Sequence, residues 1–300
     1  MAEAWQRRLR RQKTVQVHER MKLEKAIRRV IPSTSRLTYN PIFKMIVDSF
    51  DLLPKLMYKE VSKIPPNHLR IRVGVANRFL ANHVSYVSGA KDFWMHAFHA
   101  GLCRLDSTIV DIGCGCGRYT HHLRDYRFGP ERFSGKYIGI DIDEEMLNWC
   151  RRNFDSERFS FHRSNHDSKA YKAVGNPEAY YVLPMADEGA DFVFSTSLFT
   201  HLLEKEVANY CRESYRVLKR DCFMAMACFS MDHPPPTFGD RHTFGFRMGN
   251  AHVESVSVPE AVVAYEEKFL LETAREAGFR TAEMSIGGRE DWQHMLLCRK

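Results

Sequence analysis

The sequence lacks the features of a membrane-spanning, secreted or metal-bound chain. No apolar run approaches the ~18–20 residues that a helix needs to cross a bilayer. The first residues are charged and contain no apolar segment of the secretory type. None of the eight cysteines belongs to a CxxC pair, so we expect free thiols and no metal site. These absences predict a cytoplasmic protein with no transmembrane segment.

The net charge of +7 is confined to the start of the chain. Residues 1–30 hold ten Lys and Arg against three Asp and Glu, whereas the other 270 residues hold 34 of each. The main body is therefore neutral, and the basic character belongs to an appendage. Its pattern is typical of a solvated helix that packs one apolar stripe on the body. A basic arm that contacts RNA or an anionic lipid surface is the alternative.

Residues 1–104 are predicted to form a helical extension with a basic first helix. Apolar residues follow helical spacing over residues 42–61, and Pro54 is expected to bend or split that helix. A second helical region is expected over residues 69–101. Such an extension is suited to cover a ligand and to form one wall of a site on the body that follows.

From residue 105 onward, strands and helices alternate, which predicts a parallel sheet covered by helices. Strands are expected at 108–112, 136–141, 158–163, 190–196 and 221–230, with helices at 117–126, 143–154 and 202–219. A last helix at 259–277 should lead to two closing strands at 279–286 and 292–298. Residues 105–300 are therefore predicted to form one α/β domain.

A glycine-rich turn follows the first of these strands. Thr108 to Ile112 is β-branched and apolar, which predicts a buried strand. Gly113, Gly115 and Gly117 follow at alternate positions, where glycine lets the backbone turn sharply and approach a ligand. Since a helix start comes next, this is the βα turn at which nucleotide-like ligands bind in open parallel sheets.

Two acidic residues narrow the class of ligand. Asp141 ends the second strand, where a carboxylate can bind a ribose diol through two hydrogen bonds. Asp111 lies two residues before the first glycine. Its charge would repel the pyrophosphate of a dinucleotide, whereas S-adenosylmethionine offers a cationic ammonium and sulfonium. Asp111 therefore favours that ligand.

Here the chain resembles the class I S-adenosylmethionine-dependent methyltransferases. The resemblance covers residues 105–230 well and the last 40 residues more loosely. It implies a Rossmann-like seven-stranded sheet, parallel with an antiparallel last strand, and S-adenosylmethionine as the cofactor. The matching stretches are Val110-Asp-Ile-Gly-Cys-Gly-Cys-Gly117, Tyr137-Ile-Gly-Ile-Asp-Ile-Asp143, Ala190-Asp-Phe-Val-Phe-Ser-Thr-Ser-Leu-Phe-Thr-His201 and Arg212-Glu-Ser-Tyr-Arg-Val-Leu-Lys219.

The resemblance also implies which residues hold the cofactor. Ile142 would pack on the adenine ring, and either Asn165 or Asp167 would bind the adenine amine. Thr196 would lie where the backbone contacts the methionine part. The cofactor-binding set is then Asp111, Gly113, Cys114, Gly115, Gly117, Asp141, Ile142, Asn165 and Thr196.

Two long connections, at about 164–187 and 231–258, leave the carboxyl ends of strands and are candidates for acceptor recognition. A hydroxyl acceptor needs a base near neutral pKa, and histidine is the natural choice. His201 lies on the rim after the fourth strand and is the candidate base. A structural role against neighbouring backbone is the alternative. His233, His242 and His252 on the second connection are further candidates.

The sequence thus predicts a methyltransferase that acts on a small-molecule or glycan acceptor, at a hydroxyl oxygen. An RNA or protein methyltransferase that docks through the basic arm is a second possibility. A non-catalytic scaffold with the same fold is a third. The residues do not fix the oligomeric state.

Overall fold

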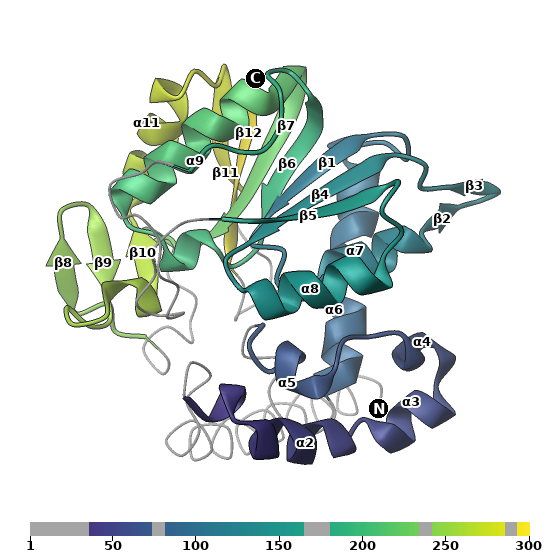
Figure 1. Ribbon diagram of the computed structural model, residues 1–300. Coiled ribbons are helices and arrows are strands. Elements are labelled where there is room, and N and C mark those ends of the chain that lie inside the picture. The colour runs from purple at the N-terminus through teal and green to yellow at the C-terminus, as the bar shows by residue number, and fades with distance from the viewer. Residues whose placement is uncertain (1–35, 74–81, 165–180, 234–241, 286–292) are drawn as a thin grey trace, which may run out of the picture.

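The computed structural model describes residues 36–73, 82–164, 181–233, 242–285 and 293–300. A seven-stranded sheet runs through the molecule in the order β11-β12-β7-β6-β1-β4-β5 (Figure 1). The five strands from β7 to β5 are parallel, and β12 is antiparallel to both of its neighbours. This is the sheet that the resemblance implied. Its strands are β1 (Thr108–Ile112), β4 (Lys136–Asp141), β5 (Phe159–Arg163), β6 (Ala190–Ser195), β7 (Leu218–Cys228), β11 (Thr281–Ser285) and β12 (His294–Arg299).

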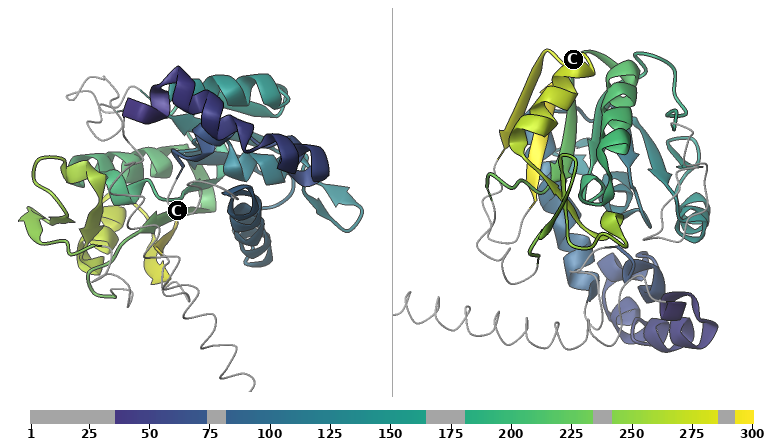
Figure 2. Two further views of the ribbon diagram at one scale, coloured as in Figure 1. Left: turned by 90° about the horizontal axis from the view of Figure 1, so that it is seen from below. Right: turned by 90° about the vertical axis from the view of Figure 1, so that its left-hand side faces the viewer.

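Helices cover both faces of the sheet (Figures 1 and 2). The helices of the α/β body are α6 (Asn82–His99), α7 (Arg118–Arg124), α8 (Glu144–Asn153), α9 (Glu204–Val217) and α11 (Glu267–Glu276). A short 3₁₀ helix, η3 (Phe199–His201), precedes α9. The hairpin of β2 (Arg127–Phe128) and β3 (Glu131–Arg132), which the sequence did not suggest, projects beside β4.

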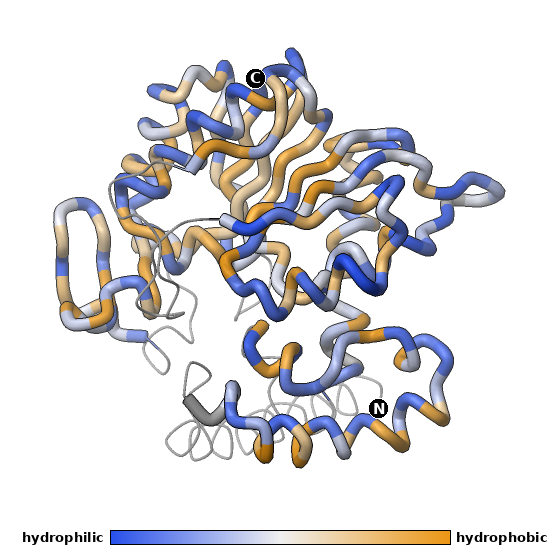
Figure 3. The backbone as a smooth tube through the Cα atoms, in the orientation of Figure 1, coloured by the Kyte–Doolittle hydropathy of each residue, from blue (hydrophilic) through white to orange (hydrophobic). Residues whose placement is uncertain are grey.

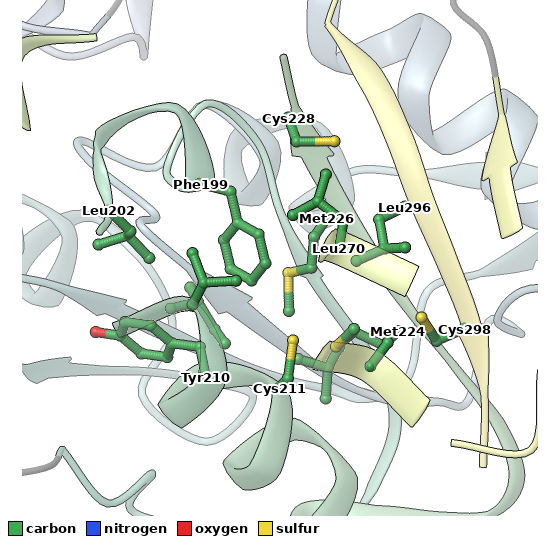
Figure 4. Close-up of a cluster of buried hydrophobic side chains, with 14 of the residues drawn as sticks. Phe199, Leu202, Tyr210, Cys211, Met224, Met226, Cys228, Leu270, Leu296 and Cys298 are labelled. Atoms are coloured by element: carbon green, nitrogen blue, oxygen red, sulfur yellow. The ribbon is translucent and has the colours of Figure 1, made fainter. Parts of the chain in front are cut away.

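The central strands are predominantly apolar, as Figure 3 shows, and β1 and β6 are buried almost along their whole length. One face packs on α9 and α11, where Phe199, Tyr210, Met226 and Leu296 meet (Figure 4). The other face packs on α6, α7 and α8. All eight cysteines are free, and seven of them are buried in this interior. They fill volume as small apolar side chains.

The N-terminal helices lie at the end of the molecule opposite the C-terminus (Figures 1 and 2). They are η1 (Arg36–Tyr39), α2 (Pro41–Ser49), α3 (Leu52–Met57), α4 (Lys59–Ser62) and α5 (Asn67–Arg70). The helix expected over residues 42–61 is split, but α2 ends at Ser49, five residues before Pro54, which sits in the first turn of α3. A proline ring clashes with the carbonyl four residues earlier, so the break precedes it.

A buried polar network holds these helices to the body. The guanidinium of Arg70 is fully buried and donates to both carboxylate oxygens of Asp51, at 2.7 and 2.6 Å. It also donates to Oδ1 of Asn82, at 3.0 and 2.6 Å, in the first turn of α6. A buried charge needs such a set of partners. The network fixes α3 and α5 against α6.

One predicted element is wrong. The single helix expected over 259–277 is instead η4 (Pro259–Ala261), β10 (Val263–Tyr265) and α11. The β-branched pair at 262–263 favours a strand, and β10 pairs with β9 (Ala251–Val253), which pairs with β8 (Phe246–Met248). The connection expected at 231–258 therefore carries part of a three-stranded sheet. Among the described helices, none is long and apolar enough to span a membrane.

Candidate active site

The glycine turn after β1 is tied to the end of β4 by its own backbone. The N–H groups of Gly113 and Cys114 both donate to the carbonyl of Ile140, at 2.7 and 3.0 Å. The N–H of Gly115 donates to Oδ2 of Asp141, at 2.7 Å. In a phosphate-binding turn these donors would point at the ligand. Because they are already used inside the protein, this turn suits a ligand without a phosphate.

Glycine is required in the turn by backbone conformation. Gly113, Gly115 and Gly117 have φ values of +86°, +53° and +78°, which side chains with a Cβ rarely adopt. Space is short as well. A Cβ on Gly115 would lie 3.1 Å from Val73, and one on Gly117 would lie 3.0 Å from the ring of Phe154. The turn is a close-packed cradle, as the sequence predicted.

Asp111 is fully buried beneath this turn. The hydroxyl of Tyr137 donates to its Oδ2, while its Oδ1 has no hydrogen-bond partner among the described residues. Burial raises the pKa of Asp111 to about 7. A buried carboxylate oxygen without a partner is costly, and a cationic ligand group would offset that cost. This orphaned atom fits the ammonium of S-adenosylmethionine.

Asp141 is held in place at the end of β4. Its Oδ2 accepts from the turn and its Oδ1 accepts from the backbone N–H of Asp143, at 2.9 Å. Burial raises its pKa to about 6, partly offset by these two bonds. Each oxygen keeps a lone pair, so the carboxylate has room for the two hydroxyls of a ribose. Half-buried Ile142 follows directly, next to where an adenine would lie.

The remaining predicted cofactor residues have different outcomes. Thr196 is half-buried directly after β6. Burial raises the pKa of Tyr119, and a hydrogen bond with Thr196 partly offsets the rise, which ties that threonine to α7. Asn165 and Asp167, the candidates for the adenine amine, lie outside the described residues.

Comparison with known proteins agrees with this geometry. Residues 110–226, from β1 into β7, match the family described as "Methyltransferase domain". The chain carries a class I S-adenosylmethionine-dependent methyltransferase domain. S-adenosylmethionine is accordingly its cofactor. The enzyme thus has a known type of reaction, while its acceptor is a separate question.

Two solved structures are similar to this methyltransferase. The PH0226 protein of Pyrococcus horikoshii OT3 has a TM-score of 0.50 and 17% identity, covering 73% of this chain and 91% of that one. A structure of S-adenosylmethionine-dependent methyltransferases from Methanosarcina mazei has a TM-score of 0.47 and 17% identity, covering 68% and 96%. At this level of identity the first likeness supports the fold alone.

His201 of the methyltransferase lies in η3, against the start of β10. Its Nδ1 is 3.0 Å from the carbonyl oxygen of Glu260 in η4. Burial lowers the pKa of His201, and the backbone of Glu260 and Ala261 partly offsets this. These contacts give the imidazole a structural part in holding η4. Its role as a base stays a hypothesis.

A second histidine lies at the same edge of the sheet with a different environment. His233 follows β7, and its Nε2 is 3.0 Å from Oε2 of Glu267 at the start of α11. Its side chain is 39% exposed. The backbone there is fixed, because His294 contacts the carbonyl of His233 at 2.7 Å and Asp232 accepts from the N–H of Glu267 at 2.6 Å. The pair is thus both accessible and oriented.

Sequence reasoning did not assign the contacts by which residues before β1 reach the cofactor side. Arg72 donates to Asp143 at 2.9 Å and to Glu145 at 2.7 Å, at the first turn of α8. Its guanidinium also lies 4.1 Å from the centre of the Tyr39 ring. Tyr86 donates to the carbonyl of Cys116 in the glycine turn, at 3.0 Å. No local pattern around these residues could indicate such long-range contacts.

Proposed function

We propose that this methyltransferase transfers the methyl group of S-adenosylmethionine to a hydroxyl oxygen of a small-molecule or glycan acceptor. The observation that carries the proposal is the pairing of His233 with Glu267. A hydroxyl must lose its proton as the new bond to carbon forms, so its methylation needs a base. A histidine whose one nitrogen donates to a carboxylate is held in the orientation and tautomer that let the other nitrogen accept a proton.

The order of the strands supports a position of this pair next to the cofactor. The glycine turn follows β1, β6 lies beside β1, and β7 lies beside β6. The carboxyl ends of parallel strands meet at one edge of a sheet, where ligands of such folds bind. His233 follows β7 and so belongs to the same edge as Asp111 and Asp141, two strands away from the turn.

Each group then has a defined task. Bound S-adenosylmethionine supplies a methyl group on a positively charged sulfur, which is a good leaving group. Asp141 would accept the two ribose hydroxyls, and Asp111 would face the cationic end of the cofactor. His233 would take the acceptor's proton as the C–S bond breaks and the C–O bond forms. Glu267 would stabilise the resulting imidazolium, and S-adenosylhomocysteine would leave with the methylated product.

Two further observations favour a polar, non-nucleic acceptor. The small sheet next to this edge carries charged groups, since Glu266 lies 3.6 Å from Arg247 and 3.7 Å from His252. Such side chains suit an acceptor with many hydroxyls. In addition, residues 196–199 read Thr-Ser-Leu-Phe after β6. Methyltransferases of exocyclic base amines often carry Asn/Asp-Pro-Pro-Tyr/Phe there, so this segment argues against that acceptor.

The cofactor site is tested first, by calorimetric titration with S-adenosylmethionine and S-adenosylhomocysteine. Asp141→Ala should weaken the binding of both compounds by at least about tenfold, which corresponds to about 1.4 kcal/mol of binding free energy. NAD should not bind, since the N–H groups of Gly113, Cys114 and Gly115 are already used inside the protein and the charge of Asp111 would repel a pyrophosphate. Equal binding by the wild type and Asp141→Ala would contradict the assigned ribose contact.

The acceptor is tested with methyl-labelled cofactor against a panel of hydroxylated small molecules and sugars. His233→Ala should lower kcat by about 10²–10⁴-fold with little change in cofactor affinity. His201→Ala is the matched variant. If His201→Ala loses most of its kcat while His233→Ala keeps its activity, His201 and not His233 is the base. Label found on an amine nitrogen would refute the hydroxyl proposal.

An RNA or protein acceptor is the second candidate, because the positive charge is concentrated in residues 1–30. Binding of such an acceptor should weaken steeply with salt, and deletion of residues 1–30 should remove that dependence. Salt-independent turnover of a small acceptor by the truncated chain would exclude it.

A further inference from the structure

The outer face of α2 and α3 is unusually apolar. Of the 15 large hydrophobic side chains that are exposed among the described residues, ten lie between Tyr39 and Tyr58. Nine of them form what we call the apolar face, each at least half exposed and Leu56 85% exposed. Figure 3 shows orange segments alternating with blue ones along α2 and α3, at the end of the molecule farthest from the C-terminus. The apolar face comprises Ile42, Met45, Ile46, Phe50, Leu52, Leu53, Leu56, Met57 and Tyr58.

This exposure is not a consequence of loose packing. The opposite side of the same helices is well anchored, because Val47 is buried in α2 and Asp51 pairs with the buried Arg70. Lys44 also reaches Glu145 of α8 at 2.5 Å. α2 is therefore held through Val47 and Lys44, and α3 is held at its N-cap Asp51, while no residue of α3 itself is buried. A contiguous apolar patch on a protein surface usually marks an interaction site.

The charge of the chain around the apolar face indicates the kind of partner that this face suits. Residues 1–73 hold 17 Lys and Arg against six Asp and Glu, whereas residues 74–300 hold 27 against 31. Exposed Lys59 and Lys63 follow the apolar face directly. An apolar helix face flanked by basic residues is the composition of helices that lie in the headgroup region of anionic membranes. Basic residues near such a surface each add to the binding.

The other occupants fit less well. A second copy of the chain, docked face to face, would bring two strongly positive segments together. RNA binding uses aromatic stacking and polar contacts, whereas seven of the nine residues of the apolar face are aliphatic side chains or methionines. We propose that the apolar face of α2 and α3 docks this methyltransferase on an anionic lipid surface, with Lys59 and Lys63 contacting the lipid headgroups.

The experiment is co-sedimentation of the full chain with vesicles of phosphatidylglycerol and phosphatidylcholine, compared with phosphatidylcholine alone. We expect binding to the anionic vesicles that weakens at high salt. Leu53→Gln, Leu56→Gln and Met57→Gln together should reduce it at least about tenfold, and glutamine keeps the helix propensity. Lys59→Gln with Lys63→Gln should also weaken binding, by about tenfold or more.

The matched control replaces three apolar residues elsewhere that are each more than half exposed, with Met95→Gln, Phe246→Gln and Val256→Gln, and should bind vesicles like the wild type. Retained affinity for S-adenosylhomocysteine shows that each variant is folded. Vesicle binding unchanged in the Leu53, Leu56 and Met57 variant overturns the proposal. Self-association in the absence of lipid that the same variant abolishes would also overturn it. Stronger vesicle binding after deletion of residues 1–35 would overturn it as well, because it would mean that this segment covers the apolar face.

Discussion

The replacement Asp111→Asn should stabilise the cofactor-free protein and weaken its binding of S-adenosylmethionine. In the folded protein burial raises the pKa of Asp111 to about 7, against an ordinary value of 3.8. The native state therefore binds more protons than the unfolded state between about pH 4 and pH 7. Stability falls as pH rises through that range and levels off above it.

The magnitude follows from the two pKa values. At pH 8 the ionised carboxylate destabilises the native state by about 4 kcal/mol, and at pH 5 by about 2 kcal/mol. An asparagine removes that cost and still accepts from Tyr137, but its amide NH₂ replaces the unpartnered oxygen at a cost of about 1–3 kcal/mol. The variant should thus gain about 1–3 kcal/mol at pH 8 and stay within about 1 kcal/mol of the wild type at pH 5.

Urea unfolding of both proteins at the two pH values measures this difference, and titration with S-adenosylmethionine measures the loss of affinity. The variant lacks the charge that faces the ammonium, so its affinity should fall at least about tenfold. A variant that is less stable than the wild type at pH 8 would refute the view that Asp111 is a destabilising charge awaiting a cation. Unchanged affinity would refute its contact with the cofactor.

Three further outcomes test the site. Affinity for S-adenosylmethionine should fall as pH drops through about 7 to 6, because protonation of Asp111 and Asp141 removes the charge and acceptors that the cofactor uses; calorimetry in two buffers should detect proton release on binding. Gly139→Ala should lower the free energy of unfolding in urea by about 1–3 kcal/mol and weaken binding of the cofactor, since the added Cβ would lie 2.9 Å from the sulfur of Cys114 in the turn. Gly278→Ala, whose Cβ would lie 2.7 Å from the Tyr215 ring at a φ of +113°, should cost as much in unfolding and leave cofactor affinity within about twofold.

The sheet could be predicted because its signals are local. The strands at 108–112 and 136–141 agree with β1 and β4 residue for residue, since each is a short apolar run bounded by a turn. The glycines and Asp141 could be assigned for the same reason. The error at residues 259–266 has the opposite cause. Acidic and aromatic residues there look like a helix start, but pairing with β9 decides the conformation, and that partner is not visible locally.

The contacts across the cofactor side were also beyond local reasoning. His233 and Glu267 are 34 positions apart, and Arg72 and Asp143 are 71 apart. Only the folded sheet and the docked helices bring them together. Residue chemistry could therefore nominate a histidine as the base, but it had no means of finding its carboxylate.

Arg72→Gln tests whether the N-terminal helices cover the cofactor. The Arg72 side chain is 5% exposed and ties the 36–73 segment to Asp143 and Glu145, whose side chains are 15% and 37% exposed. Burial raises the pKa of Glu145, but hydrogen bonds from Lys44 and Arg72 outweigh it and lower that pKa to about 2. Because the two carboxylates are partly solvated, Arg72→Gln should lower the free energy of unfolding in urea by about 1–3 kcal/mol, less than the loss expected for a fully buried ion pair.

Arg72→Gln should also weaken the binding of S-adenosylmethionine about tenfold. The reason is that the next residue, Val73, packs on Gly115 of the glycine turn and would stay over the cofactor only if the 36–73 segment is held in place. Arg104→Gln is the matched control, since its pair with Asp106 is 80% and 62% exposed and should contribute less than about 1 kcal/mol. If Arg72→Gln lowers stability but leaves cofactor affinity unchanged, the N-terminal helices pack on the domain without covering its ligand.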